Sequence, residues 1–83
     1  MAKVIVYSSA NCSYCTRAKQ LLESKGIEYQ EIRIDQDEKA REKMMVEGRR
    51  TVPQIFINDQ AIGGYDDLYA LDKAGKLDAL LTG

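Results

Sequence analysis

Histidine is absent from the 83 residues of this sequence, and its absence excludes several kinds of site. No Cys–His or Ser–His pair exists to form a nucleophile, and no His-rich site exists for a metal ion. Only two cysteines are present. Two thiolates alone cannot complete a tetrahedral zinc site within one chain, so a shared metal would need ligands from a second subunit or a small molecule.

Long hydrophobic runs are missing as well. No apolar stretch approaches the roughly 18 residues of a membrane-spanning helix. The apolar start at residues 4–7 is short and is followed by polar residues, unlike a signal peptide. Two cysteines are also too few for a secreted scaffold held by disulfides. We therefore expect a cytosolic (cytoplasmic) protein that does not bind a membrane.

Neither sign of charge dominates. Lys and Arg total 12 against 13 for Asp and Glu, which gives a formal net charge of -1. A nucleic-acid-binding protein normally carries a basic stripe, so we expect no nucleic-acid partner. Hydrophobic residues make up 45% of the chain, enough for a small core without metal or disulfide staples. The length predicts a single domain over residues 1–83.

Four stretches of β-prone residues predict strands. The first, Val4-Ile5-Val6-Tyr7, is a continuous apolar run typical of a strand buried on both faces. Asn58-Asp59 predicts a hairpin turn between the last two strands. The predicted strands cover residues 4–7, 28–34, 54–58 and 60–63.

Three segments with helical spacing separate or follow these strands, the first over residues 13–25. Their predicted N-caps are Asn11, Asp35 and Asp66-Asp67, and their predicted ends are at Gly26, Gly48 and Gly75. Residues predicted to face inward are Cys15, Ala18, Leu21, Leu22, Ala40, Met44 and Met45, followed by an amphipathic tail with Leu77, Leu80 and Leu81. The order β-α-β-α-β-β-α predicts an α/β fold, with a parallel βαβ unit, an antiparallel hairpin and helices on both faces of a mixed sheet.

The motif Cys12-Ser13-Tyr14-Cys15 falls where the first strand gives way to the first helix. Residues three apart at a helix start lie close enough for their sulfurs to bond. The unpaired N–H groups and the helix dipole stabilise a thiolate at Cys12, and the pKa of cysteines in such settings runs from roughly 3.5 to 7.5. Cys15 lies one turn deeper. We therefore expect Cys12 to attack disulfides and Cys15 to resolve the mixed disulfide.

Two other interpretations of the cysteine pair stay open from the residues alone. A Cys-x-x-Cys motif can be half of a zinc site, although no further Cys or His is present to complete one. The other alternative is that the two cysteines are unconnected core residues. The loop-like sequence around Cys12 argues against it. A redox role agrees best with the strand–helix context.

The sequence resembles the glutaredoxins, specifically their small dithiol bacterial type, over essentially its whole length. The matching stretches are Cys12-Ser13-Tyr14-Cys15, Thr51-Val52-Pro53-Gln54-Ile55-Phe56-Ile57 and Gly63-Gly64-Tyr65-Asp66-Asp67-Leu68. The resemblance implies a thioredoxin fold, with a four-stranded mixed sheet flanked by three helices. It also implies a monomeric glutathione-dependent enzyme that reduces protein disulfides and protein–glutathione mixed disulfides, without a tightly bound cofactor.

The resemblance further implies a glutathione site. Pro53 would follow a cis peptide bond that turns the Val52 backbone outward, whereas base rates alone favour trans. Asp66 would pair with the glutathione ammonium; without the resemblance, Asp66 or Asp67 is a simple N-cap. Arg49 and Arg50 are either contacts for the glycyl carboxylate or a solvated pair. The implied contacts are Tyr14, Thr51, Val52, Pro53, Gly64, Tyr65 and Asp66.

Two departures from the family pattern matter. Residues 8–11 lack the lysine that many glutaredoxins carry before the first cysteine, so we expect Cys12 to be less acidified and glutathione to be held less strongly. Ser13 stands where proline is usual and loosens the first helical turn. Some family members without that proline hold a [2Fe–2S] cluster between two subunits, with Cys12 as the matching ligand here. That cluster, and a thioredoxin-like electron donor reduced by a flavoprotein, are the alternatives.

Overall fold

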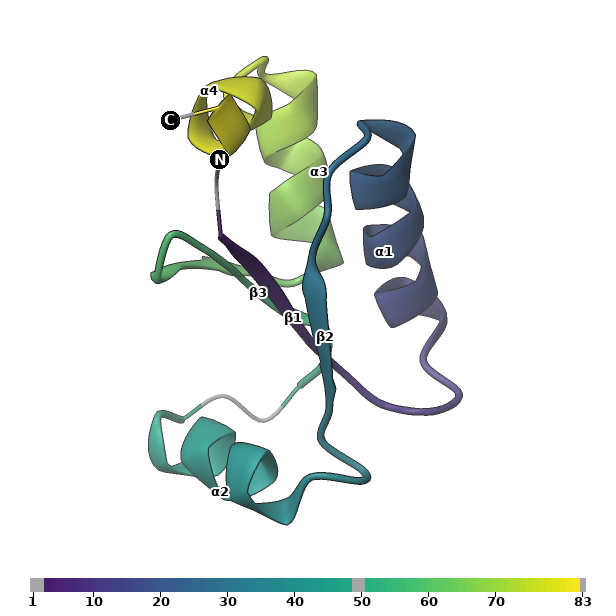
Figure 1. Ribbon diagram of the computed structural model, residues 1–83, viewed down its shortest axis with the longest axis vertical. Helices are drawn as coiled ribbons and strands as arrows, with labels where there is room; N and C mark the ends of the chain where they lie inside the picture. Colours follow the sequence, from purple (N-terminus) through teal and green to yellow (C-terminus); the bar gives the residue numbers. More distant parts are fainter. Residues whose placement is uncertain (1–2, 49–50, 83) are drawn as a thin grey trace.

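A single mixed sheet organises residues 3–48 and 51–82, the part of the chain that the computed structural model describes (Figure 1). Its strands are β1 (Val4–Ser8), β2 (Gln30–Arg33), β3 (Gln54–Ile57) and β4 (Gln60–Gly63). They lie in the order β2-β1-β3-β4. β1 runs parallel to β2 and antiparallel to β3, and β3 runs antiparallel to β4. The predicted mixed sheet is therefore confirmed.

Helices cover the sheet unequally. They are α1 (Ser13–Ser24), α2 (Glu38–Val46), α3 (Tyr65–Lys73) and α4 (Leu77–Thr82). Figure 1 shows α1 and α3 side by side on one side of the sheet, with α2 apart from them. α4 is additional to the three helices that we expected. It forms because Leu77 and Leu81, four residues apart, are 0% and 4% exposed and give the tail one buried helical stripe.

The main core lies between the sheet and helices α1, α3 and α4. Val6 pairs with Ile55 and Val4 with Ile57 across the two central strands, and all four side chains are at most 3% exposed. Burial of each such side chain is worth about 1.5–3 kcal/mol. These residues pack with Ala18, Leu22, Leu68, Leu77 and Leu81. The core fixes the starts of α1 and α3 next to each other.

The opposite face of the sheet carries a smaller apolar layer. Tyr7 and Phe56 meet edge to face with ring centroids 5.7 Å apart. In α2, Met44 is 2% exposed but Met45 is 53% exposed, so the prediction that both face inward is wrong for Met45. Consecutive helix residues point about 100° apart, and this short helix presents only one of the two to the protein.

All three predicted N-caps are wrong by one to three residues. Gly64, not Asp66 or Asp67, is the N-cap of α3, and the two aspartates lie in its first turn. Cys12, not Asn11, caps α1, and Asn11 has a left-handed backbone with φ of 57°. Asp37, not Asp35, caps α2 by accepting the N–H of Ala40. Asp35 instead accepts the N–H of Ala10 and pairs with a neighbouring arginine. The corrections at α1 and α2 have one cause: several capping side chains precede each helix, and tertiary contacts select among them.

The longest described helix, α1, has 12 residues. Over residues 3–48 and 51–82, no helix combines the length and apolar character needed to span a bilayer.

Candidate active site

Cys12 and Cys15 form a disulfide at the start of α1, with their Cα atoms 5.2 Å apart. Cys12 is partly exposed, whereas Cys15 is 1% exposed and belongs to the buried face of the helix. The predicted proximity and the predicted difference in burial are therefore both present. Only the sulfur of Cys12 is open to a substrate.

One backbone donor lies against the Cys12 sulfur. Its Sγ accepts the backbone N–H of Cys15 at 3.1 Å, which makes Cys12 the N-cap of α1. No acidic side chain lies in the first turn of this helix. An amide donor and an unopposed helix dipole stabilise negative charge on this sulfur once the disulfide is reduced.

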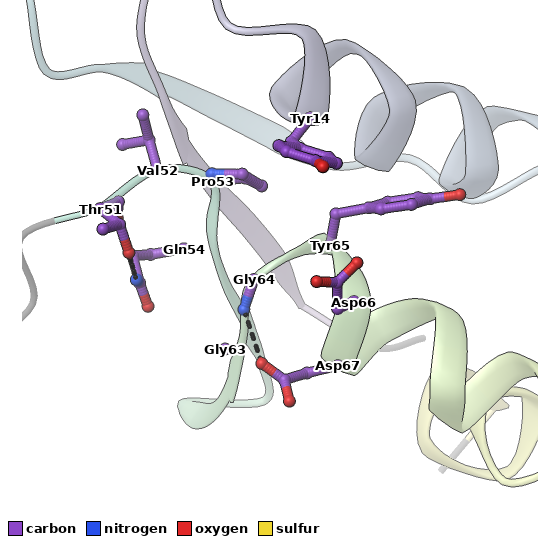
Figure 2. Close-up of a pocket in the computed structure, with 10 residues that line it drawn as sticks. All are labelled: Tyr14, Thr51, Val52, Pro53, Gln54, Gly63, Gly64, Tyr65, Asp66 and Asp67. Atoms are coloured by element: carbon purple, nitrogen blue, oxygen red, sulfur yellow. Dashed lines mark hydrogen bonds between the residues drawn. The ribbon is translucent and has the colours of Figure 1, made fainter.

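An open pocket of about 420 Å³ lies between the start of α1, the loop before β3 and the start of α3 (Figure 2). Its lining includes every residue that the family resemblance implied for glutathione: Tyr14, Thr51, Val52, Pro53, Gly64, Tyr65 and Asp66. Three residues outside that prediction also line it: Gln54, Gly63 and Asp67. Arg49 and Arg50, the two other suggested contacts, lie outside the described residues.

One wall of the pocket is the segment before β3. The Val52–Pro53 peptide bond is cis, as the resemblance implied. The carbonyl oxygen of Val52 lies 3.7 Å from the Sγ of Cys12, so the wall meets the disulfide directly. Gln54 is only 8% exposed and donates from its Nε2 to the carbonyl oxygen of Thr51 at 2.9 Å. A glutamine opening an otherwise apolar strand was the available sequence signal for this structural role.

The opposite wall is the junction of β4 and α3. The carboxylate of Asp67 accepts the N–H of Gly64 at 3.1 Å and so caps the helix (Figure 2). Asp66 is exposed and forms no ion pair within the described parts of the chain. The two adjacent carboxylates therefore differ: Asp67 is used in capping, and Asp66 is available for a cation in the pocket.

Tyr14 and Tyr65 close the third side. Their rings stack with centroids 6.2 Å apart and an interplanar angle of 25° (Figure 2). Tyr14 is 52% exposed, so its role is not core packing. The stacked rings give the pocket an aromatic surface beside the polar start of α3.

A buried polar group lies on the far side of Cys12, where sequence reasoning found none. Ser8 is fully buried and donates its hydroxyl to Oε2 of Glu31 at 2.6 Å. Lys19 binds the same oxygen at 2.8 Å. The Lys19 ammonium, followed by the Ser8 hydroxyl, holds the pKa of Glu31 below its ordinary value. This contact joins α1 to β1 and β2 just behind the cysteine loop.

Comparison with known proteins gives consistent similarities. The glutaredoxin family model matches residues 4–62. Glutaredoxin 3 of Escherichia coli K12 is 57% identical over 82 residues, covering 98% of this chain and 99% of that protein. A probable glutaredoxin of Synechocystis is 56% identical over 82 residues, covering 96% of this chain and 93% of that protein. A crystal structure of a buckwheat glutaredoxin–glutathione complex superposes with a TM-score of 0.87 at 35% identity, covering 98% of this chain and 77% of that one.

Proposed function

Since this chain belongs to the glutaredoxin family and is a thiol–disulfide oxidoreductase, we propose that glutathione drives its reactions and that Cys12 is the attacking sulfur. The substrates are protein–glutathione mixed disulfides and protein disulfides. The observation that carries the proposal is the position of Cys12: it is the more exposed member of the pair, it caps a helix, and its sulfur lies 3.7 Å from the Val52 carbonyl in the wall of the pocket.

With a mixed disulfide, Cys12 alone is sufficient. Its thiolate attacks the glutathione sulfur, a bond forms between these two sulfurs, and the protein thiolate leaves and takes up a proton. A second glutathione thiolate then attacks the glutathione sulfur held on Cys12. Oxidised glutathione leaves, and the thiolate of Cys12 is restored.

With a protein disulfide, Cys15 is also required. The Cys12 thiolate bonds to one substrate sulfur and displaces the other as a thiolate. The thiolate of Cys15 then attacks the sulfur of Cys12 and releases the second substrate thiol. This step leaves the Cys12–Cys15 disulfide seen in the structure. Two glutathione molecules reduce that disulfide and leave as oxidised glutathione.

The pocket supplies groups that suit glutathione, which carries two carboxylates and one ammonium. Free amides at the start of α3 suit a carboxylate, and the exposed carboxylate of Asp66 suits the ammonium. The backbone of Val52 beside Cys12 suits the extended tripeptide. In this arrangement the glutathione sulfur lies over Cys12.

A hydroxyethyl-disulfide assay with glutathione, coupled to glutathione reductase, tests the assignment on wild type, Cys12→Ser and Cys15→Ser. Cys15→Ser should keep deglutathionylation and lose reduction of a protein disulfide. Cys12→Ser should lose both activities. Retained turnover in Cys12→Ser would rule out the assignment. Replacing glutathione by a flavoprotein thioredoxin reductase tests the electron-donor alternative, for which we expect little turnover.

The [2Fe–2S] alternative stays a prediction with its own measurement. A bridging cluster takes one cysteine from each chain, so the position of Cys12 fits either function. Anaerobic purification followed by iron analysis and sedimentation separates them. We propose a colourless, iron-free monomer in the cytosol; a brown dimer with bound iron would favour the cluster.

A further inference from the structure

Three tyrosines form a continuous row that begins at the active site and extends beyond the pocket. Tyr14 stacks on Tyr65, and Tyr65 lies against Tyr69 with ring centroids 5.9 Å apart. Tyr14 is 52% exposed and Tyr69 is 43% exposed. We call these three residues the tyrosine row. It starts in α1, two residues after Cys12, and ends at the exposed Tyr69 of α3; Figure 2 shows its first two rings, Tyr14 and Tyr65.

A cation lies over the ring at each end of the row. The guanidinium carbon of Arg17 is 5.5 Å from the centroid of Tyr14, and Nζ of Lys73 is 5.1 Å from that of Tyr69. Neither cation pairs with a carboxylate in the part of the chain that the structure describes. Each therefore keeps its capacity for an anionic partner.

The core does not explain this arrangement. Leu68 of α3 is fully buried, whereas Tyr69 and Lys73 lie on the solvent side of the helix. Exposed aromatic rings next to unpaired cations are typical of protein-binding surfaces, where tyrosine and arginine are enriched. The row also leads away from the glutathione pocket, so it can hold a substrate protein while glutathione occupies the pocket.

We propose that the tyrosine row, with Arg17 and Lys73, is the docking surface for the protein part of the mixed disulfide, and that it selects segments in which acidic and aromatic residues flank the cysteine. An aromatic side chain of the substrate stacks on the row, and its carboxylates meet the two cations. This inference rests on the proposed function, because the docked cysteine must present its disulfide to Cys12.

Three substrates test the preference by steady-state kinetics. One is a short peptide with a glutathionylated cysteine flanked by Glu and Phe. The second has Lys in place of Glu. The third is the mixed disulfide of glutathione with mercaptoethanol, whose non-glutathione part is too small to reach Tyr69 or Lys73. Wild type should favour the acidic over the basic peptide by about tenfold in kcat/KM, mainly through KM. The preference should shrink at about 0.5 M salt because the charges are screened.

Variants at the two cations and at Tyr69 supply the second measurement. The double variant Arg17→Glu, Lys73→Glu should lose or reverse the preference, and Tyr69→Leu should raise KM for the acidic peptide by about threefold. All should turn over the small mixed disulfide as wild type does. Lys43→Glu is the matched control, since Lys43 also lies in the last turn of an exposed helix but far from the row. It should change nothing.

The outcomes are distinguishable. Equal kcat/KM of wild type for the acidic and basic peptides overturns the inference and leaves the proposed function standing. A preference for the acidic peptide that survives the double variant also overturns the inference. So does a wild-type dimer that the double variant dissociates, because the row would then bind a second copy of the chain. Failure of wild type to turn over all three substrates overturns the proposed function and this inference together. Because wild type alone gives the first result, the test does not depend on the variants folding.

Discussion

The backbone N–H of Cys15 points at the sulfur of Cys12, with the donor nitrogen 3.1 Å from Sγ. This donor belongs to the first turn of α1, so it persists when the disulfide is reduced. The buried face of the same helix is held by the core through Ala18 and Leu22, which lie in later turns. The chemistry at Cys12 therefore depends on packing several residues away.

The first prediction concerns the reactivity of that sulfur. In reduced Cys15→Ser, iodoacetamide should reach half its maximal rate with Cys12 at a pH at least one unit below the value of about 8.5 expected of free cysteine. The reason is that the amide and the helix dipole favour the thiolate. Alkylation across a pH series, followed by mass spectrometry, measures it. The same protein in denaturant is the control, and identical profiles for the folded and unfolded protein would contradict the explanation.

A second prediction concerns Gly63 at the edge of the pocket. Gly63 has φ of 114°, and a Cβ there would collide with the carboxylate of Asp67. Gly63→Ala should therefore break the cap on Gly64, lower the free energy of unfolding by about 2 kcal/mol or more, and raise KM for glutathione. Chemical denaturation and steady-state kinetics measure the two effects.

Gly75 provides the matched control for this change. It has φ of 74°, but a Cβ added there meets nothing within 4 Å. Gly75→Ala should lower the free energy of unfolding by only about 1 kcal/mol, the cost of placing a Cβ on a left-handed backbone. It should leave KM for glutathione unchanged. Equal effects of the two substitutions on KM would show that the cap on Gly64 does not shape the pocket.

A third prediction separates the two neighbouring aspartates. Asp66→Asn should raise KM for glutathione about tenfold with kcat nearly unchanged, because it removes a charge-assisted contact to the ammonium. Its effect on stability should be small, since Asp66 is exposed and unpaired in the described structure. Asp67→Asn should instead lower stability through the weakened cap. The reverse pattern would assign the ammonium contact to Asp67.

Much of the fold could be predicted because its signals are local. The apolar run at Val4 and Val6 predicted the central strand, and Asn58-Asp59 predicted the hairpin turn that the structure forms with φ values of 52° and 67°. Helix caps are less predictable. Asp35 and Asp37 both precede α2, and only the tertiary contact of Asp35 with Ala10 leaves the cap to Asp37.

The site residues also fall into those that local sequence predicted and those that it missed. The cysteine spacing and the strand–helix junction were sufficient for the redox pair, and the family resemblance supplied the pocket residues. Gln54 and Glu31 were missed because their roles depend on partners that fold against them. Gln54 holds the Thr51 carbonyl, and Glu31 meets Lys19 and the buried Ser8 only after β1, β2 and α1 assemble.

The fourth prediction concerns this Glu31 contact and its pH dependence. The folded protein lowers the pKa of Glu31 below its ordinary value of 4.5, so the contact adds stability above that value and loses it as pH falls through the lowered pKa. At about pH 7, Glu31→Gln should reduce the free energy of unfolding by about 1 kcal/mol, a modest figure because the pair is partly exposed. The difference from wild type should close in acid, where both side chains are neutral. Urea denaturation across a pH series measures this difference.

Glu42→Gln, which changes an exposed carboxylate of α2, is the control. Its difference from wild type in free energy of unfolding should not close in acid. If the difference in free energy of unfolding between Glu31→Gln and wild type stays constant with pH, Glu31 contributes through packing around Ser8 and not through its charge.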